Sequence, residues 1–426
     1  MSGHVHIIGA GMAGLAAAVR LAHMGPRLTV YEAAPRAGGR CRSYHDPQLD
    51  CVIDNGNHLL LSGNTAVRDY LAEIGASDRL AGPTEAAFPF VDVTNGARWC
   101  VQPGAGAIPW WIFDAKRRVP QTTAADYLSV LRVLRAGAHS TMADCVGTSG
   151  ALYRSFWEPL TVGAINTAPK RAAAALMRPV LRETFMKGSA ACRPLIARES
   201  LADTFVDPAL ATLARAGVNV RLGTRVRALH LGGTANTALD VDGTEVTPAP
   251  EDIVILAVPP WIAETLVPDL RVPPPGEPIV NVHFRLPQPV TPPGTIRIIG
   301  IVGGCAQWVF VRGGLASVTI SAAGDVVDQT AEMLSAACWR DVALALELQG
   351  QAEPPARVIK ERRATFAQTP ETQGLRPETV TNRHNLLLAG DWTATGLPAT
   401  IEGALRSGFK AAARVQQMTA ADSKAA

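Results

Sequence analysis

The residues with the clearest chemical pattern in this 426-residue chain stand near its start. Gly9, Gly11 and Gly14 have the spacing G-x-G-x-x-G, and Glu32 follows 21 residues after Gly11. In this pattern the first glycine permits a tight turn, the second lets the backbone approach a pyrophosphate, and the third lets a helix pack closely on a strand. Glu32 can accept hydrogen bonds from ribose hydroxyls, and its charge would repel a 2′-phosphate. The pattern predicts a dinucleotide site that disfavours NADP.

These glycines can bind phosphates only if regular elements position them. Val5–Ile8 is typical of a short buried strand, Leu15–Met24 of a helix that ends near Gly25-Pro26, and Leu28–Tyr31 of a second strand. The free N–H groups at the start of such a helix would hold the phosphates. Because strand, helix, second strand and acid are in register, a dinucleotide site is favoured over an ordinary glycine turn.

Two arginines flank a glycine pair directly after this unit, in Arg36-Ala37-Gly38-Gly39-Arg40. Arginine pairs bidentately with phosphate oxygens. The same residues could form a surface turn with solvated arginines, but their place after the dinucleotide pattern favours phosphate contact.

A polar, glycine-bearing stretch runs from Asp54 to Asn64 and turns abruptly apolar at Leu59. Gly56 could let the backbone approach a planar ring. His58 could act as a proton donor, or a backbone carbonyl at a domain junction could satisfy its ring. Both interpretations stay open.

The other end of the chain carries a glycine- and threonine-rich turn, residues 390–398, between the apolar strand Asn385–Ala389 and a helix from about residue 399. We expect this strand and helix to complete the nucleotide domain begun at residue 5. Asp391 would then lie at the carboxyl end of a strand, where open α/β sheets bind ligands. The helix after Pro398 would point its N-terminus toward the same ligand.

Apolar periodicity predicts further elements between these ends. The predicted helices are Ala124–Ala138, Ala172–Met186, Ala209–Ala216 and residues 326–349. The predicted strands are Val218–Leu222, Thr224–Leu229, a buried run from Asp252 to the Pro259-Pro260 pair, and residues 296–302, 307–312 and 316–321. The proline-rich residues 268–294 are predicted to be a crossing between domains.

The predicted fold class is therefore α/β, with a Rossmann-like nucleotide-binding domain interleaved with an α+β substrate-binding domain. The first is expected to comprise residues 1–84, 200–262 and 376–420. The second is expected to comprise residues 85–199 and 263–375.

Composition limits the classes of function. Hydrophobic residues make up 47% of the chain and charged residues 18%, which fits a large core or a surface that meets lipid. No run approaches the ~20 apolar residues of a membrane span. The N-terminus has no basic region followed by a long apolar run, so a secretory signal is not expected. A net charge of +3 without a basic block argues against nucleic-acid binding. Seven scattered cysteines without C-x-x-C argue against a disulfide framework or zinc site and suit a reducing cytosol.

An aromatic segment, Ile108–Phe113, precedes three basic residues at 116–118. Such a segment, which contains Trp110 and Trp111, could seat on an anionic bilayer surface. It could equally be core wall followed by solvated basic residues.

Together these motifs make the chain similar to the FAD-dependent amine oxidase and phytoene desaturase superfamily. The resemblance rests on the glycine pattern with Glu32, on Arg36–Arg40 and on the terminal residues 388–404, and it spans nearly the whole chain. More narrowly, the chain resembles the hydroxysqualene dehydroxylases, the squalene-associated FAD-dependent "desaturases" of bacterial hopanoid pathways. The segments that carry this narrower resemblance are Asp54–Asn64, Phe156–Leu160 with Asn166-Thr167, Gln307–Phe310, Arg363–Phe366 and Gly390–Ala404.

The superfamily resemblance implies FAD in an extended pose, with the three glycines at the pyrophosphate, Glu32 at the adenosine ribose and Arg40 near the phosphates. Some amine oxidases attach flavin to a cysteine near the terminal motif, but the closest cysteine here is Cys338, so noncovalent FAD is expected. The other implied cofactor contacts are Arg36, Gly39, Gly56, Val226 through its backbone at the adenine, Gly390, Asp391 at ribityl or phosphate oxygens, and Ile401, Glu402 and Ala404 at the flavin N1/O2 edge.

The narrower resemblance implies reductive removal of the hydroxyl of hydroxysqualene to give squalene, in bacterial squalene and hopanoid biosynthesis. Loss of hydroxide needs a proton donor, with His58 the first candidate and Asp54 the second. Trp308 could line the tunnel that an apolar substrate requires, or it could be ordinary core. The expected partners are a hydrophobic isoprenoid substrate and an unidentified electron donor. The expected location is the cytoplasm, with possible peripheral contact on the inner face of the membrane.

Other functions use the same residues. An FAD-dependent desaturase or oxidase of a carotenoid-like polyene would send electrons into the flavin, and sequence motifs do not set the direction of electron flow. A flavin-bound scaffold without turnover, within a squalene-synthesising assembly, is a third interpretation.

Overall fold

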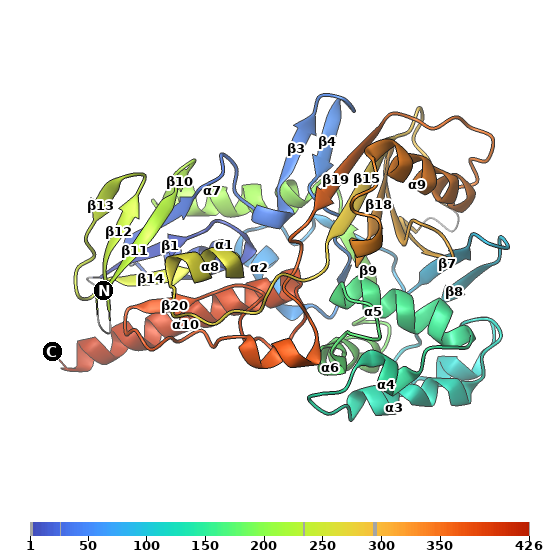
Figure 1. The fold of residues 1–426 in the computed structure, drawn as a ribbon, viewed down its shortest axis with the longest axis horizontal. Helices are drawn as coiled ribbons and strands as arrows, with labels where there is room; N and C mark the ends of the chain where they lie inside the picture. Colours follow the sequence, from blue (N-terminus) through green and yellow to red (C-terminus); the bar gives the residue numbers. More distant parts are fainter. Residues whose placement is uncertain (1–2, 26, 233–234, 293–295, 426) are drawn as a thin grey trace.

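Two large β-sheets, each assembled from chain segments far apart in sequence, organise the molecule. The computed structural model describes residues 3–25, 27–232, 235–292 and 296–425. In Figure 1 the first sheet lies with α10 (Ile401–Ala425) at the left, where both chain ends also lie. The second sheet lies with α9 (Ala331–Ala345) at the upper right.

The first sheet is entirely parallel. Its central strands are continuous apolar runs because they are buried on both faces, and all four residues of β14 are buried. The predicted strands near residues 5, 28, 218, 252 and 385 all occur in it. In spatial order the strands are β10 (Asn219–Leu222), β2 (Arg27–Glu32), β1 (His4–Ile8), β14 (Ile253–Leu256) and β20 (Leu386–Leu388).

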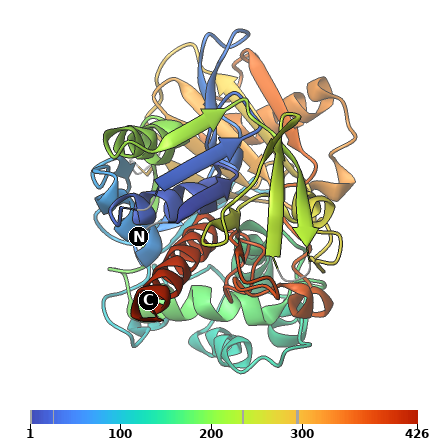
Figure 2. The same ribbon diagram turned by 90° about the vertical axis from the view of Figure 1, so that its left-hand side faces the viewer.

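Helix α1 (Met12–Ala22) follows β1 and packs against the C-terminal helix α10. Gly408 of α10 permits this close contact, since a side chain there would lie 2.3 Å from the carbonyl oxygen of Ala13. Figure 2 shows α10 running alongside the N-terminal strands. Helix α7 (Asp207–Arg215), one residue shorter than the predicted 209–216 helix at its end, also packs on α1. The two ends of the chain therefore build one layered unit.

Smaller elements surround the first sheet. An antiparallel three-stranded sheet contains β11, which begins at Val226 rather than at the predicted Thr224. The elements are β3 (Ser43–Asp46), β4 (Cys51–Asp54), β5 (Leu60–Leu61), α2 (Thr65–Glu73), β6 (Leu80–Ala81), β9 (Pro194–Ala197), β11 (Val226–Gly232), β12 (Ala235–Val241), β13 (Thr244–Val246) and α8 (Pro260–Leu266).

The second sheet has seven strands, antiparallel except at the β16–β7 pair. One of them, β15 (Ile279–Arg285), lies inside residues 268–294, for which the sequence predicted only a crossing between domains. That prediction was wrong for this stretch, because the prolines flank β15 without interrupting it and it pairs with a strand on each side. In spatial order the strands are β19 (Ala356–Glu361), β15, β18 (Leu315–Ile320), β17 (Trp308–Arg312), β16 (Ile298–Val302), β7 (Phe88–Asp92) and β8 (Arg98–Val101).

Helix α9 packs on this sheet and is shorter than the predicted helix 326–349. The side chain of Thr330 accepts a hydrogen bond from the N–H of Met333 and fixes the first helical residue at Ala331. Glu347, with φ of 60°, lies beyond the last turn. Local capping therefore sets the two ends of α9, and apolar periodicity alone predicted a helix that was too long.

A region of short helices lies below the second sheet, at the lower right of Figure 1. The predicted helix Ala124–Ala138 is helical from Ala124 to Leu134, but its first part is the 3₁₀ helix η3 and its α-helical part, α3, ends four residues earlier than predicted. The predicted helix Ala172–Met186 is also too long, since Thr184 leaves the helical region with φ −122° and ψ −84°. The elements are η2 (Trp110–Phe113), η3 (Ala124–Leu128), α3 (Ser129–Leu134), α4 (Met142–Val146), the π-helical η4 (Tyr153–Trp157), α5 (Glu158–Ile165), α6 (Ala174–Glu183) and η5 (Phe185–Lys187).

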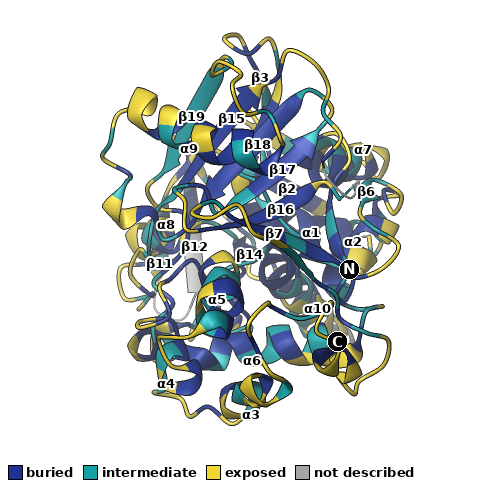
Figure 3. Ribbon diagram, turned by 90° about the vertical axis from the view of Figure 1, so that its right-hand side faces the viewer, coloured by how far each residue is buried: buried dark blue, intermediate teal, exposed yellow. Residues whose placement is uncertain are grey.

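Burial differs between the two parts of this half of the molecule. Figure 3 shows the inner strands of the second sheet largely buried and the edge strand β19 partly exposed, whereas α3 and α4 expose their outer faces. Within the described ranges no helix is long and apolar enough to cross a membrane.

Candidate flavin site

The glycines of the N-terminal turn have two different steric roles. Gly9 has φ of +105°, and a side chain there would lie 2.5 Å from the carbonyl oxygen of Ala257. A side chain on Gly14 would lie 1.9 Å from the carbonyl oxygen of Gly9. Gly11 is different, because nothing lies within 4 Å of the place its side chain would occupy. Gly9 and Gly14 are thus required by packing, whereas Gly11 borders open space.

The start of α1 faces this open space. Gly11 is the N-cap residue and supplies no side-chain cap to the first N–H groups of α1. The Gly38-Gly39 turn lies beside it, with the N–H of Gly38 donating to the carbonyl of Ala10 over 2.7 Å. The result is an uncapped helix N-terminus between two glycine-rich turns, an arrangement that suits phosphate groups.

Glu32 is held at the carboxyl end of β2 by backbone donors. Its carboxylate accepts hydrogen bonds of 2.8 Å from the N–H groups of Ala10 and Ala34. Each oxygen retains a second acceptor position that a hydroxyl can use. The N–H of Thr224 donates to the Glu32 carbonyl over 2.8 Å, which brings the start of β11, and with it Val226, beside the acid.

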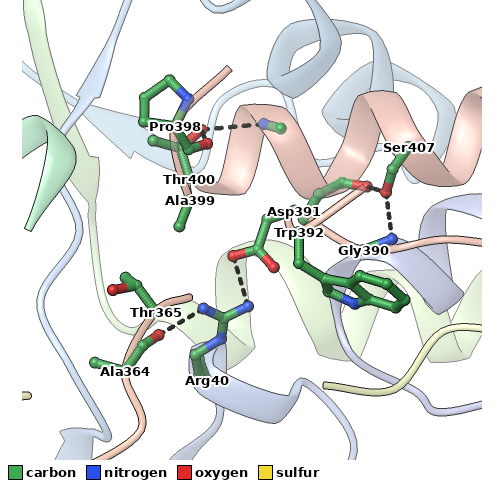
Figure 4. A network of polar contacts seen from close by, with 12 residues as sticks. Arg40, Ala364, Thr365, Gly390, Asp391, Trp392, Pro398, Ala399, Thr400 and Ser407 are labelled. Atoms are coloured by element: carbon green, nitrogen blue, oxygen red, sulfur yellow. Dashed lines mark hydrogen bonds and ion pairs between the residues drawn. The ribbon is translucent and has the colours of Figure 1, made fainter. Parts of the chain in front are cut away.

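Arg40 and Asp391 join the two ends of the chain (Figure 4). One guanidinium nitrogen of Arg40 lies 2.7 Å from Asp391 Oδ2, and another donates to the carbonyl of Ala364 over 2.6 Å. Asp391 is buried, but the Arg40 side chain is 43% exposed. Burial disfavours the charge on Arg40, yet Asp391 outweighs this effect and raises the pKa of Arg40. Arg40 therefore keeps a fixed charge with part of its surface free for a ligand.

The C-terminal turn owes its glycine and threonine content to internal hydrogen bonds. Gly390 has φ of +153°, and its N–H donates to Ser407 Oγ over 2.8 Å. Thr393 Oγ1 donates to the Gly390 carbonyl over 2.9 Å, and the Trp392 indole N–H donates to the Val258 carbonyl over 2.9 Å. These bonds fix Asp391 beyond the end of β20.

Arg376 is a buried residue of the site that no sequence pattern indicated. Its guanidinium donates to the carbonyls of Asp391 and Thr393 and stacks 4.8 Å from the centre of the Phe366 ring. Burial lowers the pKa of Arg376 to about 10, and the charge of Asp391 partly opposes this shift. Arg376 thus remains charged at neutral pH and holds the turn from behind.

Glu402 uses its carboxylate within the protein. The two oxygens accept hydrogen bonds of 3.0 Å from the N–H groups of Ala66 and Val67 at the start of α2. Arg406 pairs with the same carboxylate at 2.8 Å. If Glu402 contacts the cofactor, it must therefore do so through its backbone. Ile401 and Ala404 lie beside it at the start of α10.

These residues fit the cofactor that the sequence implies. Open space beside Gly11, an uncapped helix start, a positioned carboxylate and a fixed arginine all meet at the carboxyl edge of the parallel sheet. When bound there, FAD would have Gly11 and Arg40 at its phosphates and Glu32 at a ribose. The assignment of each residue to a part of FAD stays a prediction, as does a role for Arg36, which is exposed and makes no side-chain hydrogen bond to the described residues.

The loop that carries Gly56 and His58 is pinned to the second sheet. The amide oxygen of Asn281 on β15 accepts bonds from the backbone and side chain of Asn57 at 3.4 and 3.3 Å, and from Thr319 at 2.9 Å. His58 is half-buried and makes no hydrogen bond to any residue that the structure describes. The alternative in which a backbone carbonyl satisfies its ring therefore has no support. His58 lies close enough to Arg40, Asp54 and Asp391 to respond to their charges.

Asp54 is fully engaged. One oxygen accepts bonds from Ser43 Oγ at 2.6 Å and from the N–H of Leu201 at 2.9 Å. The other lies 2.6 Å from a guanidinium nitrogen of Arg312, and the side chains of Asp54 and Arg312 are 2% and 11% exposed. This geometry favours an anchoring role for Asp54, with an electrostatic effect on His58, over proton donation.

We expect His58 to be neutral at neutral pH in the protein without ligand. Burial, and then the charge of Arg40, lower its pKa from the ordinary value of 6.5 to about 4. Because the folded-state pKa is depressed, the stability that neutral His58 contributes is complete above pH 6.5 and is lost as the pH falls toward 4. An NMR titration of labelled histidine, assigned with His58→Gln, should place the midpoint near 4. Arg40→Gln should raise that midpoint, and a wild-type midpoint near 6.5 would contradict the assignment.

The comparisons with known proteins agree with this geometry. The family model described as flavin containing amine oxidoreductase matches residues 12–416. The chain belongs to this flavin-containing amine oxidoreductase family. It is 46% identical to a hydroxysqualene dehydroxylase of Sinorhizobium fredii, over 97% of this chain and 98% of that one. It is also 46% identical to the hydroxysqualene dehydroxylase of Rhodopseudomonas palustris, over 97% and 98% of the two chains.

Solved structures of the family share the fold. Cyclohexylamine oxidase from Brevibacterium oxydans superimposes with a TM-score of 0.71 at 16% identity, over 98% of this chain and 99% of the other. A variant of putrescine oxidase gives a TM-score of 0.72 at 16% identity with the same coverage. The predicted α/β fold class, the superfamily resemblance and FAD as the cofactor are confirmed, and this member of the family is an FAD-dependent oxidoreductase.

Proposed function

We propose that this flavoenzyme reductively removes the hydroxyl group of hydroxysqualene and releases squalene, in bacterial squalene and hopanoid biosynthesis. The observation that carries the proposal is the 46% identity, over nearly the full length of both chains, to relatives named hydroxysqualene dehydroxylase. The family fold alone would also suit a carotenoid-like desaturase. The near-full-length relatives at 44–46% identity carry the name hydroxysqualene dehydroxylase, which favours the proposed reaction over that alternative.

The proposed reaction replaces a carbon–oxygen bond by a carbon–hydrogen bond. Reduced FAD supplies a hydride, which is two electrons and one proton equivalent. The hydroxyl leaves with a second proton as water, so the atoms and electrons balance. The protein must therefore position an apolar substrate, exclude bulk water and supply that second proton.

His58 is the residue we propose for proton delivery. Its ring is half-buried, has no hydrogen-bond partner among the described residues and responds to Arg40 and Asp391, which ties it to the cofactor site. A pKa of about 4 keeps most of the rings neutral at neutral pH. Negative charge brought near the ring would raise this pKa. Proton donation should therefore become more efficient as the pH falls.

Trp308 is the residue we propose to border the substrate. It is half-buried on β17 and packs in one apolar cluster with Leu59, the neighbour of His58. It also meets Phe90 edge to face at 5.4 Å and faces Gly163 of α5, where an added side chain would lie 3.0 Å from its indole nitrogen. A ring held between the second sheet and α5 suits the wall of an apolar site next to the proton donor.

The proposal also includes partners. Reduction of the flavin requires an electron donor, which stays unidentified. We propose a cytoplasmic protein that makes peripheral contact with the inner face of the membrane, because a long isoprenoid substrate partitions into lipid.

An anaerobic single-turnover assay tests the reaction. Photoreduced protein mixed with hydroxysqualene should form squalene, detected by mass spectrometry, as the flavin reoxidises. His58→Gln should slow this reoxidation by roughly 100-fold, the usual contribution of a positioned acid. The wild-type rate should also rise toward lower pH, and this rise should disappear in His58→Gln.

Two results would refute parts of the proposal. If hydroxysqualene is not consumed but a polyene such as phytoene bleaches the oxidised flavin, the enzyme is a desaturase and the substrate must be withdrawn. If His58→Gln keeps the wild-type rate and pH profile with normal flavin content, His58 is not the donor.

A further inference from the structure

The sequence left open whether residues 108–118 are core wall or a membrane-facing segment, and the structure divides them. Trp111 is only 9% exposed and meets Tyr127 edge to face at 5.4 Å. Trp110 and Phe113, in the same short helix η2, are 68% and 65% exposed, and Ile108 is 58% exposed. One face of η2 therefore anchors it in the core while the other presents large apolar side chains to solvent.

Helix α3 continues this exposed surface. η2 contacts η3, and η3 runs directly into α3. Leu128, Leu131, Arg132 and Arg135 recur at helical spacing and are all exposed, with Leu128 at 59% and Leu131 at 41%. An outward stripe that mixes leucine with arginine is typical of helices that lie on lipid surfaces.

The net charge of this surface is positive, and part of it is free to pair with an anionic partner. Residues 108–135 contain five basic and two acidic residues. Both acids cap local turns, since Asp114 accepts from the N–H of Lys116 and Asp126 accepts from Thr123. By contrast, Lys116, Arg132 and Arg135 make no side-chain hydrogen bond or ion pair with the described residues. Arg117 and Arg118 donate to backbone carbonyls and hold the segment together.

A pocket opens beside the stripe. It measures about 660 Å³ and is lined by η3 and α3 on one side and by residues 146–157 on the other. Leu128 and Arg132 belong both to the stripe and to the pocket wall. The π-helical turn η4 forms part of the opposite wall, and Trp157 of that turn donates to Ser129 over 3.1 Å. Single π-helical turns of this kind are frequent at functional sites.

We propose that the exposed face of η2, η3 and α3 docks on an anionic phospholipid bilayer, with Arg132 and its pocket receiving a lipid head group. Trp110, Phe113 and Leu128 would enter the interface, where aromatic and apolar side chains gain most. Lys116 and Arg135 would pair with anionic head groups. The inference deepens the peripheral contact of the proposed function and rests on it, because docking would place the enzyme where an apolar substrate resides.

Vesicle sedimentation tests the docking surface with the flavin-loaded protein. The protein should sediment with mixed phosphatidylcholine–phosphatidylglycerol vesicles, far less with phosphatidylcholine alone, and less as salt is raised. Arg132→Gln should weaken binding to the anionic vesicles about fivefold, the effect expected for one arginine at such a surface. Trp110→Ser should also weaken it. Arg340→Gln, which removes an exposed arginine on the distant helix α9, should leave binding unchanged.

The outcomes separate this inference from the proposed reaction. Equal binding to neutral and anionic vesicles, or equal loss in Arg132→Gln and Arg340→Gln, would overturn the docking surface. Detergent-dispersed hydroxysqualene gives the reaction without a bilayer, so Arg132→Gln should turn over there at the wild-type rate. Absence of squalene in that assay would refute the proposed function whatever the vesicles show.

Discussion

Replacing Gly11 by valine is expected to deprive the protein of flavin while leaving it folded. Gly11 has φ of −75° and ψ of −178°, an extended conformation that any residue adopts. Nothing lies within 4 Å of the position a side chain would take, so the protein itself does not require glycine there. A bound pyrophosphate would require it, because the backbone must approach closely. An overpacking cost of about 1–3 kcal/mol corresponds to roughly 5- to 150-fold weaker binding.

The measurement is the ratio of flavin to protein absorbance after purification, together with far-ultraviolet circular dichroism. Gly374→Ala is the matched control, because Gly374 also borders open space without a positive φ and lies outside the site. Gly14→Val makes the opposite case, since its side chain would collide with the Gly9 backbone and should prevent folding. Full flavin content in Gly11→Val would mean that the phosphates do not lie against this glycine.

The nucleotide half of the fold could be predicted because its signals are local. Gly9, Gly14 and Glu32 stand in one βαβ unit, and their spacing encodes the turn, the helix contact and the acid, although Gly9 also packs against Ala257 from outside that unit. The C-terminal strand and helix were predictable for a related reason, since a buried apolar run followed by a glycine turn has few other interpretations. β15 could not be predicted in this way. The prolines on either side of it indicate a linker, and its partner strands β18 and β19 come later in the chain.

The site was predictable only where the backbone does the binding. Arg376 and Ser407 support the turn at Asp391 through hydrogen bonds to backbone groups, and neither stands in a recognisable pattern. The two tryptophans 110 and 111 show the same limit. Adjacent identical residues take opposite environments, one buried and one exposed, because their side chains leave a short 3₁₀ helix in different directions. Periodicity carries no such information over four residues.

Aspartate 54 illustrates how a chemically suitable residue can serve the fold instead. Asp54 ends β4 and Arg312 ends β17, far apart in the sequence and in different sheets, yet the two form a pair with little exposure to solvent that ties the flavin half to the second sheet. Its other oxygen holds Ser43 and the backbone of Leu201. With both oxygens engaged in fixed contacts, Asp54 is placed to hold neighbouring segments together rather than to face a substrate.

We therefore expect Asp54→Asn to destabilise the protein strongly. The amide keeps the shape of the carboxylate but removes the charge that balances Arg312, whose side chain is only 11% exposed. Breaking a buried pair by removing one partner costs about 3–5 kcal/mol, and denaturation of the flavin-loaded protein should show a loss of that size. Asp328→Asn is the control, because the Asp328–Arg362 pair is 81% and 61% exposed and should change stability by less than about 1 kcal/mol.

The same variant also reads out the effect of Asp54 on His58. The negative charge of Asp54 raises the pKa of His58 against the larger effect of burial. Asp54→Asn should therefore lower the His58 titration midpoint below the wild-type value, a change that a purely mechanical anchor would not produce. A contrary result would be a loss of stability no larger than that of Asp328→Asn, together with an unchanged His58 midpoint. Asp54 would then neither anchor the two halves nor tune the histidine, and it would again be a candidate proton donor.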